Sequence, residues 1–223
     1  MKKKIAILGS TGSIGKTLIN ILKKNKKNFE IVLLSVNKNI RELEKQVDLF
    51  DVKNLIVIDK KNYLKIKSKK KFKKTNIFND FLSIDKIFKN KVDYVMSSIS
   101  GIEGLSPTIQ IIKHTKKIAI ANKEAIICGW NIIKNELDKN KTEFIPVDSE
   151  HFSINYALKK INQSNVENIY LTASGGPLKD LPLSKFKSIT IHDALKHPNW
   201  KMGKKISIDS ATMMNKVFEI IEA

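Results

Sequence analysis

The chain has 223 residues, 42% of them hydrophobic, which is enough for one large domain or two small ones with an apolar core. Its formal net charge of +19 comes from lysines scattered over the whole chain beside one arginine, Arg41, so we interpret it as a lysine-biased composition rather than as a nucleic-acid-binding surface. The sequence also contains no apolar run long enough for a membrane helix, and its single cysteine, Cys128, excludes an internal disulfide.

The start of the chain and its cysteine indicate a cytoplasmic location. A strand-like run begins almost at Met1, which leaves no room for a targeting peptide, and one cysteine fits a reducing compartment. Cys128 lies in an apolar helical pattern without an obvious base beside it. We therefore expect Cys128 to be a core residue.

The first 150 residues alternate between strand and helix patterns. Continuous apolar runs predict strands, helical apolar spacing predicts the segments between them, and Lys65–Lys74, with seven lysines in ten residues, reads as a helix end and loop. Such alternation favours a parallel sheet covered on both faces. The expected strands are 4–8, 31–36, 55–58, 93–98, 117–121 and 143–147, and the expected helices are 16–24, 40–50, 80–89, 105–114 and 124–138.

The organisation changes after Glu150. A helix over about 151–161, a strand over 167–173, a segment with Pro182 and Pro198, and a helix over 211–222 follow. We predict an α/β fold in which a Rossmann-like parallel sheet domain, residues 1–150, is followed by the beginning of an α+β catalytic domain, residues 151–223.

A glycine-rich turn joins the first strand to the first helix. Its glycines, Gly9, Gly12 and Gly15, are spaced as in a variant of the dinucleotide-binding fingerprint, where a pyrophosphate lies on the helix N-terminus. The second strand is followed by Lys38 and Arg41, with no acid before Glu42. Because an acid at this place selects NAD, we favour NADPH over NADH.

Two carboxylates follow the apolar run 144–147. In an extended chain Asp148 and Glu150 point to the same side, and two like charges at one spot favour a divalent cation between them. Further along, a helix start predicted at the capping residues Asp209–Ser210 places Asn215, Lys216 and Glu219 on one face. Glu219 is therefore a candidate third metal ligand.

Three shorter segments also carry candidate site residues. Asn122-Lys123-Glu124 stands at the carboxyl end of a predicted strand, where open α/β sheets bind ligands. Ser174-Gly175-Gly176-Pro177 reads as an anion-holding turn, and His197 and Trp200 share a loop bounded by proline and glycine that is suited to closing over a ligand.

Together these motifs resemble those of the 1-deoxy-D-xylulose 5-phosphate reductoisomerase family, over essentially the whole chain. They occur in the order found in that family: Gly9-Ser-Thr-Gly-Ser-Ile-Gly15, Ala121-Asn-Lys-Glu124, Pro146-Val-Asp-Ser-Glu-His151, Ser174-Gly-Gly-Pro177, His197-Pro-Asn-Trp-Lys-Met-Gly203 and Lys205-Ile-Ser-Ile-Asp-Ser-Ala-Thr-Met-Met-Asn-Lys216. The resemblance implies NADPH- and metal-dependent rearrangement and reduction of 1-deoxy-D-xylulose 5-phosphate to 2-C-methyl-D-erythritol 4-phosphate, in non-mevalonate isoprenoid biosynthesis.

The resemblance also implies roles for individual residues. Mg or Mn would be bound by Asp148, Glu150 and Glu219, which with Lys123 form the expected catalytic set. The cofactor would contact Thr11, Gly12, Ser13, Ile14, Asn37, Lys38, Asn39, Asn122, Glu124 and Gly203. The sugar phosphate would contact Lys123, Ser149, Glu150, Ser174, His197, Ser210, Asn215, Lys216 and Glu219, with Trp200 in a mobile flap.

The chain departs from the family in two ways. Asn37 stands where the family usually has glycine, and family members continue into a C-terminal helical domain, so the resemblance implies a C-terminally incomplete chain whose complete form is a homodimer. Membrane and nucleic-acid partners are not expected. The alternatives are another Rossmann oxidoreductase of the semialdehyde or homoserine dehydrogenase type, and a truncated non-catalytic remnant that binds nucleotide or, through its basic charge, nucleic acid.

Overall fold

The computed structural model describes residues 1–159, 161–200 and 202–223. The chain divides into two compact units, Met1–Val147 and Asp148–Ala223, and each is described by itself below. Within the described residues, none of the helices has the length and apolar character that crossing a bilayer requires.

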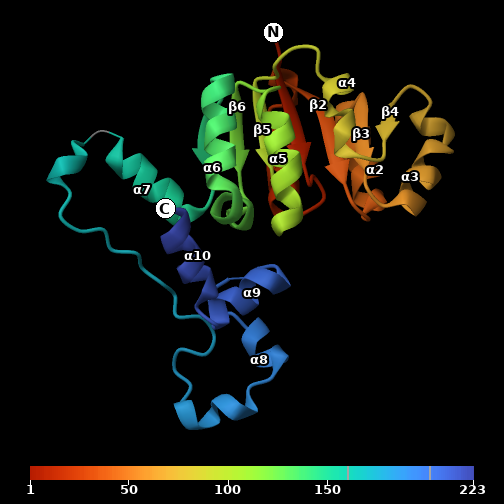
Figure 1. The fold of residues 1–223 in the computed structure, drawn as a ribbon. Coiled ribbons are helices and arrows are strands. Elements are labelled where there is room, and N and C mark those ends of the chain that lie inside the picture. The colour runs from red at the N-terminus through yellow and green to blue at the C-terminus, as the bar shows by residue number, and fades with distance from the viewer. Residues whose placement is uncertain (160, 201) are drawn as a thin grey trace. The chain divides into compact units, whose positions relative to one another are not determined.

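The first unit, all of whose residues the structure describes, is built on a parallel sheet (Figure 1). The strand order is β4-β3-β2-β1-β5-β6-β7, so the direction of winding reverses between β1 and β5. This order and the parallel pairing confirm the predicted Rossmann-like sheet. The strands are β1 (Lys3–Leu8), β2 (Phe29–Val36), β3 (Asn54–Val57), β4 (Asn76–Phe78), β5 (Tyr94–Ser97), β6 (Lys117–Ile120) and β7 (Glu143–Pro146).

Helices cover both faces of this sheet because successive strand residues point to opposite sides. Ile5 and Ile7 of β1 pack in one apolar cluster with α1, α2 and α3, whereas Ala6 and Leu8 pack in the other with α4, α5 and α6. In Figure 1 helices α5 and α6 lie side by side against the sheet. The helices are α1 (Ser13–Lys24), α2 (Ile40–Phe50), α3 (Lys60–Lys67), α4 (Ile84–Ile87), α5 (Leu105–Ile112) and α6 (Lys123–Asn140).

The structure adds to and corrects several predicted elements of the first unit. Helix α1 begins at Ser13, within the glycine-rich turn and three residues before the expected start. The edge strand β4 was not predicted, and of helix α3 only an end within Lys65–Lys74 was. The helix expected over 80–89 is reduced to a 3-10 turn and the four residues of α4. The prediction of a buried Cys128 was wrong, since this residue is exposed on α6.

The second unit consists of helices and extended segments. Its helices are α7 (Ser149–Leu158), α8 (Ile191–Leu195), α9 (Lys204–Ala211) and α10 (Met214–Glu222), and a 3-10 helix spans Leu183–Ser188. The strand predicted over 167–173 was wrong: these residues have no regular secondary structure and pair with no other segment among the described residues. An apolar β-like sequence becomes a strand only where a neighbour accepts its backbone hydrogen bonds.

The helix start predicted at Asp209–Ser210 was also wrong. These two residues lie in the last turn of α9, and the chain breaks at Met213, whose left-handed backbone (φ 61°) lets α10 begin at Met214. The pattern of helical residues was continuous in sequence, and only the break separates α9 from α10. Asn215, Lys216 and Glu219 consequently lie on a short helix of their own.

Candidate active site

The glycine-rich turn of the first unit tolerates no side chain at two positions. Gly9 has a φ of +78°, and a Cβ there would lie 2.8 Å from the carbonyl oxygen of Ser98. A Cβ on Gly15 would lie 2.6 Å from the backbone oxygens of Gly9 and Ser10. Glycine at these places lets β1, the turn and α1 pack backbone against backbone.

The same turn leaves the N-terminus of α1 open to a ligand. Gly12 is the N-cap residue, and no side chain caps the first N–H groups of the helix. A cavity of about 520 Å³ lies over the turn, and its wall is formed at the carboxyl ends of β1, β2 and β5. This is the point where the strand order reverses, the usual dinucleotide position in such sheets. Among the lining residues are Gly9, Thr11, Gly12, Ser35, Asn37, Ser98, Ser100 and Glu103.

The structure distributes the predicted cofactor residues around this cavity unevenly. Thr11, Gly12 and Asn37 line it, and Ser13 and Ile14 form the first turn of α1. Asn37, where the resemblance led us to expect glycine, does not have a positive φ, so its backbone does not require glycine. Asn39 caps α2, its side chain accepting a hydrogen bond from the Glu42 N–H at 3.2 Å, and Lys38 beside it is exposed.

Asn122, Lys123 and Glu124 stand at the start of α6. Asn122 is buried and accepts a hydrogen bond from the Ala125 N–H at 2.9 Å. Its side-chain amide also donates to the carbonyls of Ile99 and Gly101, so it connects the start of α6 to the loop that follows β5. Lys123 is buried too, with 8% of its surface exposed, and Glu124 is half-buried. None of the three lines the cavity over the glycine turn.

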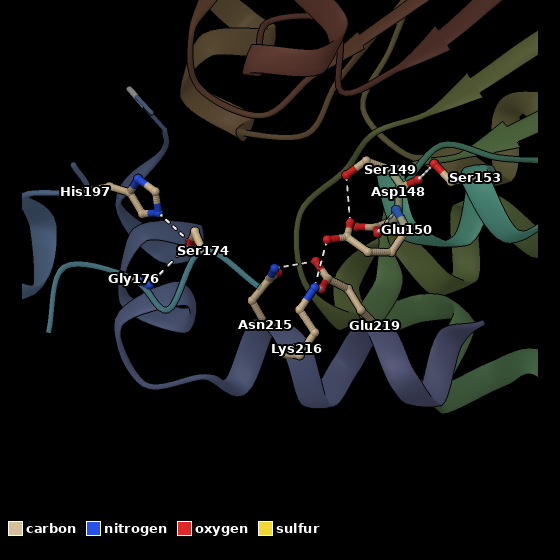
Figure 2. A network of polar contacts seen from close by, with 10 residues as sticks. All are labelled: Asp148, Ser149, Glu150, Ser153, Ser174, Gly176, His197, Asn215, Lys216 and Glu219. Atoms are coloured by element: carbon tan, nitrogen blue, oxygen red, sulfur yellow. Dashed lines mark hydrogen bonds and ion pairs between the residues drawn. The ribbon is translucent and has the colours of Figure 1, made fainter. Parts of the chain in front are cut away.

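Three carboxylates meet in the second unit. Asp148 and Glu150 come from the start of α7 and Glu219 from α10, and one oxygen of each lies within 4.8 Å of the others. The extended geometry predicted for Asp148 and Glu150 was wrong, because Asp148 is the N-cap of α7 and accepts from the Glu150 N–H at 3.3 Å. The first helical turn, and not a strand, turns both acids to one side. Figure 2 shows the three side chains converging.

Lys216 neutralises part of this acidic cluster. Its Nζ lies 2.8 Å from Glu150 Oε1 and 2.5 Å from Glu219 Oε2, and Asn215 also donates to Glu219. Burial by itself raises the pKa of the Glu150 carboxyl, but hydrogen bonds from Lys216 and Ser149 outweigh it and lower that pKa to about 2. Burial by itself lowers the pKa of the Lys216 ammonium group, but hydrogen bonds to Glu150 and Glu219 raise it by more. The net shift of the Lys216 pKa is therefore upward. Glu150 and Lys216 are therefore both charged at neutral pH.

Ser174 and His197 form a second polar group in the same unit (Figure 2). His197 Nε2 lies 3.1 Å from Ser174 Oγ, which also accepts the Gly176 N–H at 3.3 Å. Gly176 has a φ of +69°, and a Cβ there would lie 2.6 Å from the carbonyl oxygen of Ser210. The absence of a side chain thus lets this turn pack directly on the end of α9.

A cavity of about 520 Å³ in the second unit brings most of the predicted substrate and metal residues together. Its lining includes Asp148, Ser149, Glu150, Ser174, His197, Trp200, Ser210, Asn215, Lys216 and Glu219. Gly203, a predicted cofactor contact, is the N-cap of α9 and is not among the lining residues, and Lys123 belongs to the first unit. The cavity thus contains three carboxylates together with the ammonium group of Lys216, and, separate from these, the hydroxyl of Ser174 and the imidazole of His197.

Sequence reasoning missed several residues that line the two cavities. In the first unit these are Ser98, Ser100 and Glu103, which follow β5; the polar run after a buried strand was the available signal. In the second unit Met202, Ile206 and Met213 add apolar surface beside Trp200. Their sequence patterns are those of ordinary core residues, so only the fold identifies them.

The chain matches two family profiles over most of its length. The profile described as 1-deoxy-D-xylulose 5-phosphate reductoisomerase covers residues 5–129, and the one described as the C-terminal domain of the same enzyme covers residues 144–223. The chain belongs to the 1-deoxy-D-xylulose 5-phosphate reductoisomerase family. This confirms the resemblance drawn from the sequence motifs.

Curated relatives and solved structures agree with this assignment. The chain is 62% identical to a 1-deoxy-D-xylulose 5-phosphate reductoisomerase of Pelagibacter ubique and 43% identical to one of Caldanaerobacter subterraneus, covering 99% of this chain and 58% of each relative. It is 30% identical to the Zymomonas mobilis reductoisomerase solved with NADPH, with a TM-score of 0.84 over all of this chain and 57% of that one. A reductoisomerase solved with NADPH, fosmidomycin and magnesium, also 30% identical, gives a TM-score of 0.85 over 99% of this chain and 57% of that one.

Proposed function

We propose that this chain supplies the NADPH-binding and metal-binding parts of a 1-deoxy-D-xylulose 5-phosphate reductoisomerase. The reaction would rearrange the carbon skeleton of 1-deoxy-D-xylulose 5-phosphate and reduce the resulting aldehyde with NADPH to 2-C-methyl-D-erythritol 4-phosphate. The observation that carries this proposal is the meeting of Asp148, Glu150 and Glu219 in a cavity that also contains Ser174, Asn215 and Lys216. Because the chain spans 58% of the length of the relatives it matches, activity is proposed for the whole protein.

The three carboxylates fit a hard divalent cation. All three offer oxygen, they come within 4.8 Å of one another, and Glu219 is only 3% exposed, so its charge is stable only with cationic partners. Bound there, Mg or Mn would act as a Lewis acid on the ketone and hydroxyl oxygens of the substrate. Ser149, whose hydroxyl donates to Glu150 Oε2 at 2.7 Å, would hold Glu150 in place and contact the substrate.

The rest of the second cavity suits the phosphate end of the substrate. Ser174, Ser210, Asn215 and Lys216 offer hydroxyl, amide and ammonium donors to its oxygens, and His197 lies against Ser174. Binding energy gained at this remote group can be used to align the reacting carbons. Trp200, 65% exposed, would belong to the flap that keeps water from the aldehyde.

The first cavity suits the nicotinamide cofactor. Gly9 and Gly15 keep the turn tight, and the uncapped N-terminus of α1 offers N–H groups to a pyrophosphate. Lys38 and Arg41 are exposed beside Asn37 and would favour the 2′-phosphate of NADPH. We further propose that Lys123 stabilises negative charge on a substrate oxygen, and that Asn122 and Glu124 act by shaping the loop beside the cofactor.

A metal-dependent NADPH oxidation assay tests the proposal. The complete protein that contains this chain is mixed with 1-deoxy-D-xylulose 5-phosphate, NADPH and Mg or Mn, and wild type is compared with Glu150→Gln. Turnover should fall at least about 100-fold in this variant, because metal catalysis contributes several kcal/mol. Glu167→Gln, which changes an exposed acid of the same unit, is the matched control and should retain activity.

The remaining expectations form part of the same proposal and have their own tests. Homodimerisation and a cytoplasmic location of the complete protein stay predictions. A non-catalytic remnant would show no turnover, and a salt-sensitive DNA mobility shift without NADPH binding would favour a nucleic-acid-binding role. Thermal stabilisation by NADPH, larger than by NADH, would support the enzyme and its cofactor preference.

A further inference from the structure

His197 uses both of its ring nitrogens within the second unit. Nδ1 accepts hydrogen bonds from the backbone N–H groups of Asn199 at 3.2 Å and Trp200 at 3.1 Å. Nε2 lies 3.1 Å from Ser174 Oγ, which is 23 residues earlier in the chain. One imidazole therefore connects the turn that carries Trp200 to the glycine-rich turn at Ser174.

The two backbone donors fix the position of the ring proton. A ring nitrogen that accepts N–H groups carries a lone pair, so the proton of neutral His197 resides on Nε2. Nε2–H then donates to Ser174 Oγ, which also accepts the Gly176 N–H at 3.3 Å. With two donors directed at this oxygen, the hydroxyl hydrogen of Ser174 is available to a third group.

That third group would lie in the cavity. Ser174, His197 and Trp200 all line it, and the cationic Lys216 lines it too. An anionic oxygen in the cavity would accept the Ser174 hydroxyl proton, and each hydrogen bond in such a chain polarises the next. The imidazole ring of His197 thus links two things: the hydrogen bond that Ser174 would donate to an anion, and the backbone turn that positions Trp200.

We propose that His197 is a positioning residue with two separable tasks. Its Nε2–H orients the Ser174 hydroxyl as a donor to the phosphate group, and its Nδ1 holds the turn at 198–200 so that Trp200 faces the cavity. The phosphate role rests on the function proposed above. The tautomer and the turn do not, because both are set by contacts within the chain.

Two substitutions separate the tasks. In His197→Asn the amide occupies the place of Nδ1 and can accept the two backbone N–H groups, but it does not reach Ser174. In His197→Gln the amide occupies the place of Nε2 and can donate to Ser174, but it leaves the turn without its acceptor. Ser174→Ala is the matched variant that removes the hydroxyl while keeping His197.

We would measure the affinity for 1-deoxy-D-xylulose 5-phosphate and for inorganic phosphate, using the fluorescence of Trp200 as the signal. Because the chain has two tryptophans, all variants carry Trp130→Phe. Affinity should fall about tenfold in His197→Asn and in Ser174→Ala, the effect of one hydrogen bond to a charged group. The two losses should not add in the double variant. His197→Gln should keep affinity within about threefold and make Trp200 more accessible to a neutral quencher.

The opposite pattern would overturn the inference. The inference fails if His197→Asn and His197→Gln lose affinity equally while the accessibility of Trp200 to the quencher is unchanged. It also fails if the affinity losses of Ser174→Ala and His197→Asn add in the double variant. Nitrogen NMR of the four histidines, with His197 assigned from its loss in the variants, gives a readout that needs no ligand. A proton on Nδ1 of neutral His197 would contradict the positioning role even if the substrate binds. If instead the proton is on Nε2 but the chain binds no phosphate compound, only the phosphate role is contradicted, and with it the proposed function.

Discussion

The two units of this protein are stabilised by different interactions. The first unit buries large apolar side chains on both faces of its sheet, among them Leu34, Leu55 and Ile111, which are fully buried. In the described residues of the second unit the buried hydrophobic residues are two alanines, Ala194 and Ala211. Its other buried residues include charged ones that stand in ion pairs.

This difference indicates how each site responds to its surroundings. Apolar burial is insensitive to pH and to ions, so the glycine turn is held by the sheet whether or not a ligand is bound. A carboxylate cluster with one lysine is sensitive to both, because a buried charge without its partner is costly. We expect the stability of the first unit to depend on the volume of its buried apolar side chains. We expect that of the second unit to depend on its paired charges and on a bound divalent cation.

The largest effect should come from the core of the first unit. Leu34→Ala on β2 should lower the free energy of unfolding by about 2–5 kcal/mol, because it leaves a cavity in a fully packed sheet. Urea denaturation monitored by Trp130, whose ring lies 5.4 Å from that of Phe144, reports on this unit. The control is Ile220→Ala on α10, where the side chain is 60% exposed and about 0.5 kcal/mol or less is expected. Similar losses for both would contradict the contrast between the units.

Removal of the lysine in the acidic cluster should have the next largest effect. Lys216→Met leaves Glu150 and Glu219 without their shared cation and should destabilise the second unit by about 1–3 kcal/mol in chelator. Mg should restore more stability to this variant than it adds to wild type, since binding to the folded state shifts unfolding by mass action. Denaturation monitored by Trp200 gives both values, with Lys204→Met at an exposed position as control. Equal responses to Mg in the variant and in wild type would contradict a shared site.

The glycine turn offers a test that does not depend on a ligand. Gly15→Ala should cost about 1–3 kcal/mol, because the new methyl group would meet backbone atoms at 2.6 Å. Gly12→Ala is the matched control: its Cβ would contact Gly9 at 3.4 Å, and its φ of −72° suits alanine. Thermal unfolding of the two variants without cofactor should therefore differ, and an equally tolerant Gly15 would refute the close backbone packing.

The smallest effect is a dependence on acid pH through Glu150. Its pKa lies at about 2 in the folded chain against 4.5 ordinarily, so its stabilising contribution is full above about pH 4.5 and is lost as pH falls toward 2. Since a quarter of the side chain is exposed, we expect about 1 kcal/mol. The measurement is the difference in unfolding free energy between wild type and Glu150→Gln, which should shrink across this range. A difference that stays constant with pH would show that the ion pair with Lys216 does not form.

The sequence by itself predicted the sheet and the turn because both follow from local patterns. The runs 31–36 and 117–121 are apolar and β-branched, and the glycines of the first turn are needed by the backbone wherever the rest of the chain lies. The edge strand β4 escaped notice because three residues give no periodicity. Ala121–Glu124 was placed at a strand end correctly, but the hydrogen bonds that Asn122 donates to the carbonyls of Ile99 and Gly101 join it to residues more than twenty positions away, which the sequence does not show.

Only the tertiary structure decided the rest, because it depends on contacts between residues far apart in the chain. Residues 167–173 have the composition of a strand but no partner, Cys128 faces solvent on an amphipathic helix, and Met213 divides what looked like one helix. From their spacing we predicted that Asp148 and Glu150 lie together in an extended chain, whereas they lie together at the start of a helix. Spacing alone does not predict that Glu219 lies beside them. Their meeting requires α7 and α10 to pack, and packing is settled by the whole unit rather than by any one segment.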